Sequence, residues 1–181
     1  MGVQNSCKHT TSETEAEEEL YRLYAQILRL KAAGKTVNAY NGCEEDPGEP
    51  DGDVLAYFIE YIYVYHPKNR PDWLEAFYQV LCWQFTSFHE GVDVYYENFY
   101  GDSDRETICR TAKFLQENGY ADIEEPYQKG IVLCDQTEQI SLTKEIYEWL
   151  CEHTKEVWDF CVDILEKNRL SWPGITSKTA L

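Results

Sequence analysis

Apolar residues recur at intervals of three and four along most of the chain, and the first such run covers residues 20–30. This spacing predicts a helix with one apolar face. Ser12 and Glu15 have the capping-box spacing that favours a helix start, and Gly34 favours a helix end. We therefore predict a first helix between Ser12 and Gly34.

Residues 54–65 carry a pattern that fits two kinds of element. Their tyrosine and isoleucine content is typical of a strand. Every third or fourth residue of the segment is also apolar, which places one apolar face on a helix. Because the neighbouring segments are helical, we favour a helix and keep a strand as the alternative.

The second half of the chain repeats the helical pattern. Pro71 suits the first turn of a helix that continues to Phe85, and Ser103 with Glu106 repeats the capping-box spacing. A broad apolar face then predicts one long helix near residues 141–168. A length of 181 residues suits one domain with a sizeable core. We predict a single all-α domain of six to eight helices over residues 12–168, a flexible segment at 1–11 and a loose tail at 169–181.

Turn-forming and aromatic residues alternate between His89 and Tyr120, where the sequence reads H-E-G-V-D-V-Y-Y-E-N-F-Y-G-D. Glycine and asparagine are the residues that most readily adopt positive φ, and aspartate or serine can cap the next helix. We predict that this motif sets backbone geometry, with Asp102 or Ser103 as the cap. Its assigned positions are Gly91, Tyr95, Asn98, Gly101 and Asp102.

The motif resembles the central pattern of a family of small bacterial helical proteins whose best-known member is an acidic, dimeric DNA mimic. The likeness covers about 35 of the 181 residues, and the spacing from Gly91 through Asn98 to Gly101 is kept without a gap. Glu90 replaces the family's first glycine, and Phe99-Tyr100 replace two small residues. The resemblance implies a helical fold and the blocking of a helix-turn-helix regulator by imitation of DNA.

Charge narrows the function classes further. The chain has 33 acidic and 16 basic residues, a net charge of −17, and an ordinary apolar content of 43%. Such a field repels nucleic acid and anionic membranes and attracts basic proteins. We therefore do not expect the protein to bind nucleic acid directly, because lysine and arginine supply most of the affinity for the phosphate backbone.

The acids are concentrated in three places along the chain. Rows of carboxylates on helices and on a proline-bearing loop suit the imitation of duplex DNA, which carries about one charge per 1.7 Å of axis. We predict that these acids contact a protein partner. The three clusters are Glu15, Glu17, Glu18 and Glu19; Glu44, Glu45, Asp46, Glu49, Asp51 and Asp53; and Asp122, Glu124 and Glu125.

One alternative is catalytic. His89, Glu90 and Asp93 come close to the H-E-x-x-H signature of zinc proteases and would centre a metal-assisted hydrolase. Gly91 weakens the helix that would align His89 with Asp93, and the simpler interpretation is that His89 ends a helix. The chain has no G-x-S-x-G and no phosphate-binding loop. We therefore predict no enzyme activity, no cofactor and no bound metal.

The fourteen tyrosines and seven cysteines add two expectations. Tyr57, Tyr61, Tyr63 and Tyr65 are candidates for an interface, although core packing is the simpler role. The cysteines are odd in number and form no C-x-x-C pair, which favours a reducing, cytoplasmic setting. No apolar run reaches the ~18 residues of a membrane span.

The sequence thus predicts a non-catalytic protein that occupies the nucleic-acid-binding site of a basic partner. That partner would be a transcription regulator, or a nuclease such as a CRISPR effector that a phage-borne inhibitor blocks. An immunity or adaptor protein for a basic toxin is a further alternative. Whether the protein forms a homodimer is left open.

Overall fold

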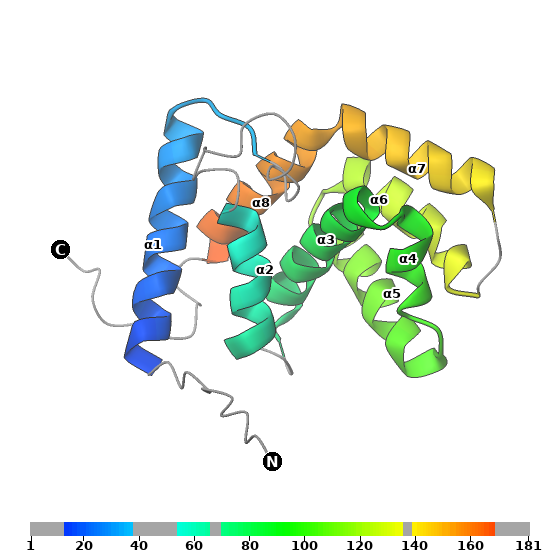
Figure 1. The fold of residues 1–181 in the computed structure, drawn as a ribbon, viewed down its shortest axis with the longest axis horizontal. Coiled ribbons are helices and arrows are strands. Elements are labelled where there is room, and N and C mark those ends of the chain that lie inside the picture. Colours follow the sequence, from blue (N-terminus) through cyan, green and yellow to red (C-terminus); the bar gives the residue numbers. More distant parts are fainter. Residues whose placement is uncertain (1–12, 38–53, 66–69, 136–138, 169–181) are drawn as a thin grey trace, which may run out of the picture.

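A computed structural model describes residues 13–37, 54–65, 70–135 and 139–168 (Figure 1). These residues form eight α-helices and one 3-10 helix, and they contain no strand, which confirms the all-α fold. The predictions for residues 1–11 and 169–181 lie outside the described residues. The elements are α1 (Glu13–Ala32), α2 (Val54–Tyr65), α3 (Asp72–His89), α4 (Val92–Glu97), α5 (Asp102–Glu117), α6 (Ala121–Lys129), η1 (Gly130–Asp135), α7 (Ile140–Glu152) and α8 (Thr154–Asn168).

Helix α3 is the centre of the fold. It packs against α2, α4, α5, α7 and α8, while α1 covers α2 and α8 (Figure 1). Most of its residues are buried, including Leu74, Phe77, Val80 and Leu81. Because apolar side chains point to almost every side of α3, the other helices surround it and complete one core.

The ambiguous segment 54–65 is a helix. Leu55 and Tyr61 are buried, whereas Tyr57 and Tyr63 are exposed. A strand would place all four odd-numbered side chains on one face, and only the helical period separates them. Phe58 packs edge-on against Phe77 of α3 with ring centroids 5.6 Å apart, so the buried face of α2 is fixed against the central helix.

The predicted long helix at 141–168 is divided at His153. Its backbone leaves the helical region there, with φ −114° and ψ 31°. Thr154 Oγ1 donates to the carbonyls of Leu150 and Cys151, each at 3.4 Å, and so provides a hydrogen-bond donor for carbonyls in the last turn of α7. The division lets α7 pack on α4 and η1 while α8 packs on α1. Both halves are amphipathic, so the apolar pattern gave no sign of the break.

The backbone of the turn-rich motif agrees with part of its prediction. Gly91 and Gly101 have φ of 127° and 125°, which confirms the positive φ expected of them. Asn98 has φ −65° and is helical, so the same expectation was wrong for Asn98. Helix α5 begins at Asp102 and Gly101 holds the N-cap position without a side-chain hydrogen bond, so the prediction of a cap at Asp102 or Ser103 was wrong.

None of the helices in the described residues combines the length and the apolar character that crossing a membrane requires.

Candidate protein-binding surface

Buried hydrogen bonds tie the turn-rich motif to the centre of the fold. Tyr95 of α4 is buried, its hydroxyl donates to Gln79 Oε1 at 2.9 Å, and it lies 2.7 Å from the hydroxyl of Tyr127 in α6. Gln79 Nε2 in turn donates to Glu75 Oε1 at 2.7 Å. Burial raises the pKa of Tyr95 well above its ordinary value, so the phenol stays protonated. Tyr95 therefore serves as an anchor between three helices.

The network ends at a buried ion pair. Arg70 Nη1 lies 3.1 Å from Glu75 Oε2, and each side chain is only 8% exposed. The guanidinium of Arg70 also covers the ring of Tyr78 at 4.0 Å from its centroid. Arg110 approaches Glu75 at 3.8 Å. With its carboxylate paired in this way, Glu75 supports the packing of α3.

The residues of the hydrolase alternative do not share a helix. His89 is the last residue of α3, and its ring packs against Phe85 with centroids 4.3 Å apart. Glu90 caps the end of α3, and Asp93 belongs to α4 beyond the turn at Gly91. Nowhere in the described part of the chain do three histidine, cysteine or acidic side chains converge as metal ligands. His89, Glu90 and Asp93 are therefore distributed over the end of one helix, its cap and the next helix.

The structure describes the three predicted acidic clusters to different extents. Glu18 is exposed, and Glu19 accepts a hydrogen bond from Arg22 Nε at 2.8 Å that lowers the pKa of its carboxyl. On α6, Asp122 and Glu125 are exposed and Glu124 is half-buried. The side chains outside the described residues are those of Glu15, Glu17, Glu44, Glu45, Asp46, Glu49, Asp51 and Asp53.

The third cluster faces a cleft of about 300 Å³ between α6, α7 and α8. Two of its acids line this cleft, and two further acids come from the opposite wall. Ile146 and Pro126 supply part of the apolar surface beneath them. The four carboxylates are those of Asp122, Glu125, Glu145 and Glu156.

One lysine bridges the walls of the cleft. Lys129 Nζ lies 3.1 Å from a carboxylate oxygen of Glu145 and 3.1 Å from one of Glu125. Hydrogen bonds to these carboxylates, Glu145 first, raise the pKa of Lys129. Four carboxylates and one ammonium give the cleft a formal charge of −3, with His153 left out of the sum. The cleft therefore remains attractive to a cation.

Stacked rings form the aromatic part of the cleft. The rings of Trp149 and His153 lie 4.5 Å apart and nearly parallel, and Trp149 also stacks at 6.0 Å on the buried Trp83. His153 Nδ1 is 2.9 Å from the carbonyl of Trp149, which holds the imidazole in place. The aliphatic stem of a lysine or arginine can pack along such rings while its charged head stays beside the carboxylates. Aromatic rings beside carboxylates suit a basic side chain.

The sequence predicted two of the four carboxylates in the cleft, those of Asp122 and Glu125. It did not indicate Glu145, Trp149 or Glu156 as part of a site. The helical spacing of Glu145, Trp149 and His153 was present in the sequence, at intervals of four residues. What it did not reveal is which helix faces them, because that depends on the division at His153.

The structure therefore offers an acidic cleft built from three helices, carried by a chain with a net charge of −17. Comparisons of the chain with models of protein families, with curated proteins and with solved structures found no match.

Proposed function

We propose that the protein is a non-catalytic inhibitor that presents carboxylates where a basic partner expects phosphates. The partner is a nucleic-acid-binding protein, either a transcription regulator or a nuclease such as a CRISPR effector. The resemblance of the Gly91–Asp102 motif to an acidic DNA-mimic family supports the same proposal.

One observation carries the proposal: acids from three different helices line a single cleft beside an aromatic wall. Acids that merely keep a protein soluble have no need to converge. Converging carboxylates beside the Trp149–His153 stack create a position where a lysine or arginine pairs its charge with several carboxylates and packs its stem along the rings.

The mechanism has two stages. The net charge of −17 attracts a basic surface from a distance and raises the association rate. Basic side chains that normally hold phosphates then pair with the carboxylates of the cleft and of the other acidic clusters. The partner's nucleic-acid site is thereby occupied. Exposed charges are screened within about 10 Å at 0.1 M salt, so binding weakens as salt rises.

The test is competition. A partner is captured from a bacterial extract at low salt, released at high salt and purified. A labelled DNA or RNA bound to that partner is then titrated with this protein. We expect displacement of the nucleic acid and a steep loss of binding with salt.

A charge-matched pair of triple variants locates the contact. The cleft variant carries Asp122→Asn, Glu125→Gln and Glu156→Gln. The control carries Asp104→Asn, Glu97→Gln and Glu106→Gln, which are exposed acids outside the cleft and change the net charge equally. We expect the cleft variant to lose at least ten times more affinity than the control, about 1.4 kcal/mol.

Two results would overturn the proposal. Simultaneous binding of this protein and of nucleic acid to the partner, with no loss of affinity for either, would show that the acids do not imitate phosphates. A captured partner with no nucleic-acid site would instead support the alternative of an immunity protein for a basic toxin.

A further inference from the structure

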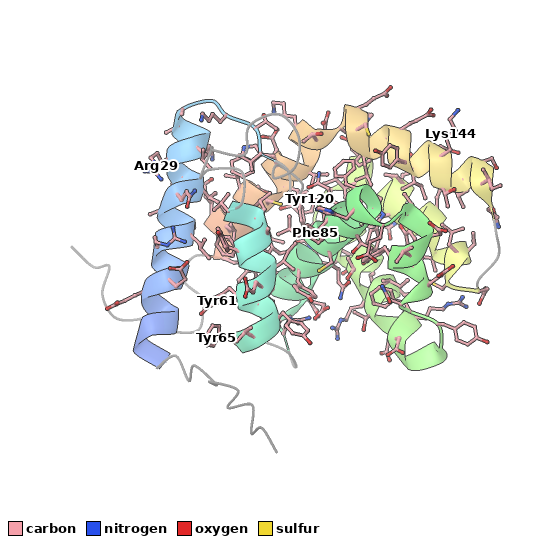
Figure 2. All side chains as sticks on the ribbon, viewed as in Figure 1. Arg29, Tyr61, Tyr65, Phe85, Tyr120 and Lys144 are labelled. Atoms are coloured by element: carbon pink, nitrogen blue, oxygen red, sulfur yellow. The ribbon has the colours of Figure 1, made fainter. Side chains whose placement is uncertain are left out.

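Helix α2 presents exposed aromatic side chains on the face turned away from the core. Tyr63 is 66% exposed and Tyr57 is 46% exposed, with Val64 beside them at 54%. Tyr61 is buried and packs at a tilt against Tyr65 with ring centroids 4.9 Å apart, so the predicted interface role does not extend to Tyr61 (Figure 2). Exposed aromatic clusters of this kind are typical of binding surfaces.

Two of these exposed side chains, Tyr57 and Tyr63, line a groove of about 460 Å³ between α2 and α3. Tyr57, Ile59 and Tyr63 form the α2 side, and Tyr78 and Phe85 form the α3 side. The α3 side is held firmly, because Arg70 covers the ring of Tyr78 and is itself fixed by the buried Glu75. A rigid apolar wall lowers the entropy cost of binding.

Among the described residues that line the groove, one is charged. Glu60 lines it, is exposed, and forms no ion pair within the described part of the chain. Its position is three residues from both Tyr57 and Tyr63, so on the helix the carboxylate stands between the two rings. A ligand of this groove therefore needs apolar side chains flanking one basic side chain.

We infer that the groove binds an amphipathic helix of a partner protein, with apolar residues against the tyrosines and a lysine or arginine against Glu60. A groove between two rows of side chains is a surface onto which an amphipathic helix can pack. Helix α2 is 12 residues long, about 18 Å, which matches roughly three turns of a bound helix.

Charge argues against a second copy of this chain as the occupant. Two copies meeting at this groove would bring Glu60 against its counterpart, and two molecules of charge −17 repel each other. A basic amphipathic helix meets neither obstacle. The inference also stands apart from phosphate imitation, because a helix bound at α2 and α3 need not overlap the cleft between α6, α7 and α8.

The experiment uses two synthetic peptides of identical composition. One places leucines at helical spacing on one face with a single lysine between them and further lysines on the opposite face, and the second is scrambled so that no apolar face exists. Binding to the full chain is measured by calorimetry, and the contact is mapped by the backbone amide shifts of α2 and α3. We expect the amphipathic peptide to bind at least ten times more tightly than the scrambled peptide.

Matched variants test whether the peptide binds in the groove between α2 and α3. Tyr63→Ala is expected to weaken binding about ten-fold or more, whereas Tyr100→Ala, with Tyr100 65% exposed elsewhere, leaves binding unchanged. Glu60→Gln is expected to weaken binding several-fold and Glu97→Gln to have no effect. Since Tyr63 and Glu60 are exposed, neither change disturbs the fold.

Two outcomes would overturn the inference. Equal binding of both peptides, insensitive to Tyr63→Ala, would mean that charge alone attracts them. A concentration-dependent dimer in sedimentation that Tyr63→Ala abolishes would mean that a second copy occupies the groove.

Discussion

Replacing Gly130 by alanine is expected to destabilise the fold although the backbone there suits alanine. Gly130 has φ −71° and ψ −14°, an ordinary helical conformation. A Cβ added to it would meet Tyr96 Cζ at 2.1 Å and the Tyr96 hydroxyl at 2.4 Å. Tyr96 cannot yield easily, because it is fully buried and donates a hydrogen bond to the carbonyl of Tyr127 at 2.8 Å. A glycine is therefore required at position 130 because the ring of Tyr96 leaves no room for a side chain there.

The magnitude follows from these contacts. Overpacking a core typically costs about 1–3 kcal/mol. Displacing Tyr96 breaks its hydrogen bond and leaves a buried carbonyl without its donor, which costs a further ~1–3 kcal/mol. Alanine offsets about 0.4–1 kcal/mol of this loss, because it has less conformational entropy than glycine in the unfolded chain. We therefore expect a net loss of about 2–4 kcal/mol, or about 4–16 °C in melting temperature for a domain of this size.

The assay is urea unfolding of Gly130→Ala in two backgrounds. In the Tyr96→Leu background the clashing atoms are gone, so the same glycine change is expected to cost almost nothing. Gly34→Ala is the control, because Gly34 has φ 68° and open space around it and should cost only about 1–2 kcal/mol. A neutral or stabilising Gly130→Ala would refute the reasoning.

Three further predictions concern stability. Gly101→Val is expected to cost about 1–3 kcal/mol, visible as a lower melting temperature, because φ 125° with ψ 151° is a region almost confined to glycine. Arg70→Ala leaves the carboxylate of Glu75 buried and is expected to cost about 3 kcal/mol in urea unfolding, whereas loss of an exposed pair costs under ~1 kcal/mol. Burial, and then the hydrogen bond to Asp163, raise the pKa of Tyr120 to about 12 from an ordinary value of 10. Its contribution to stability is therefore complete below pH 10 and is lost as the pH rises through 12, so Tyr120→Phe should flatten the stability profile in that window. An unchanged profile would contradict the assignment.

Local signals predicted most of the helices because helix formation is itself local. Apolar spacing fixed the region of α1, and the glycines at 91 and 101 marked two real turns. The division at His153 escaped detection for a physical reason. It rests on Thr154 donating to carbonyls of the preceding turn and on the different neighbours of α7 and α8, and neither appears in an apolar pattern.

The candidate site was predictable only in part, because it is a product of tertiary contacts. Asp122 and Glu125 are adjacent to other acids in the sequence, so their cluster was visible. Glu145 and Glu156 each stand among mixed charges, and their role arises only when α7 and α8 face α6. Tyr95 shows the same limit, since its partner Tyr127 is 32 residues away.

The lysine that spans the cleft has a consequence for how selective the cleft is. Lys129 is tethered to α6, so the carboxylates of Glu125 and Glu145 meet it at a high effective concentration, as they would meet a linked ligand. Any incoming basic side chain must displace this internal competitor. A single lysine from a casual neighbour gains little by the exchange, whereas a partner that brings several basic groups at once, or adds contact with Trp149, gains enough to replace it. The cleft thus discriminates by the number of contacts that a partner makes together.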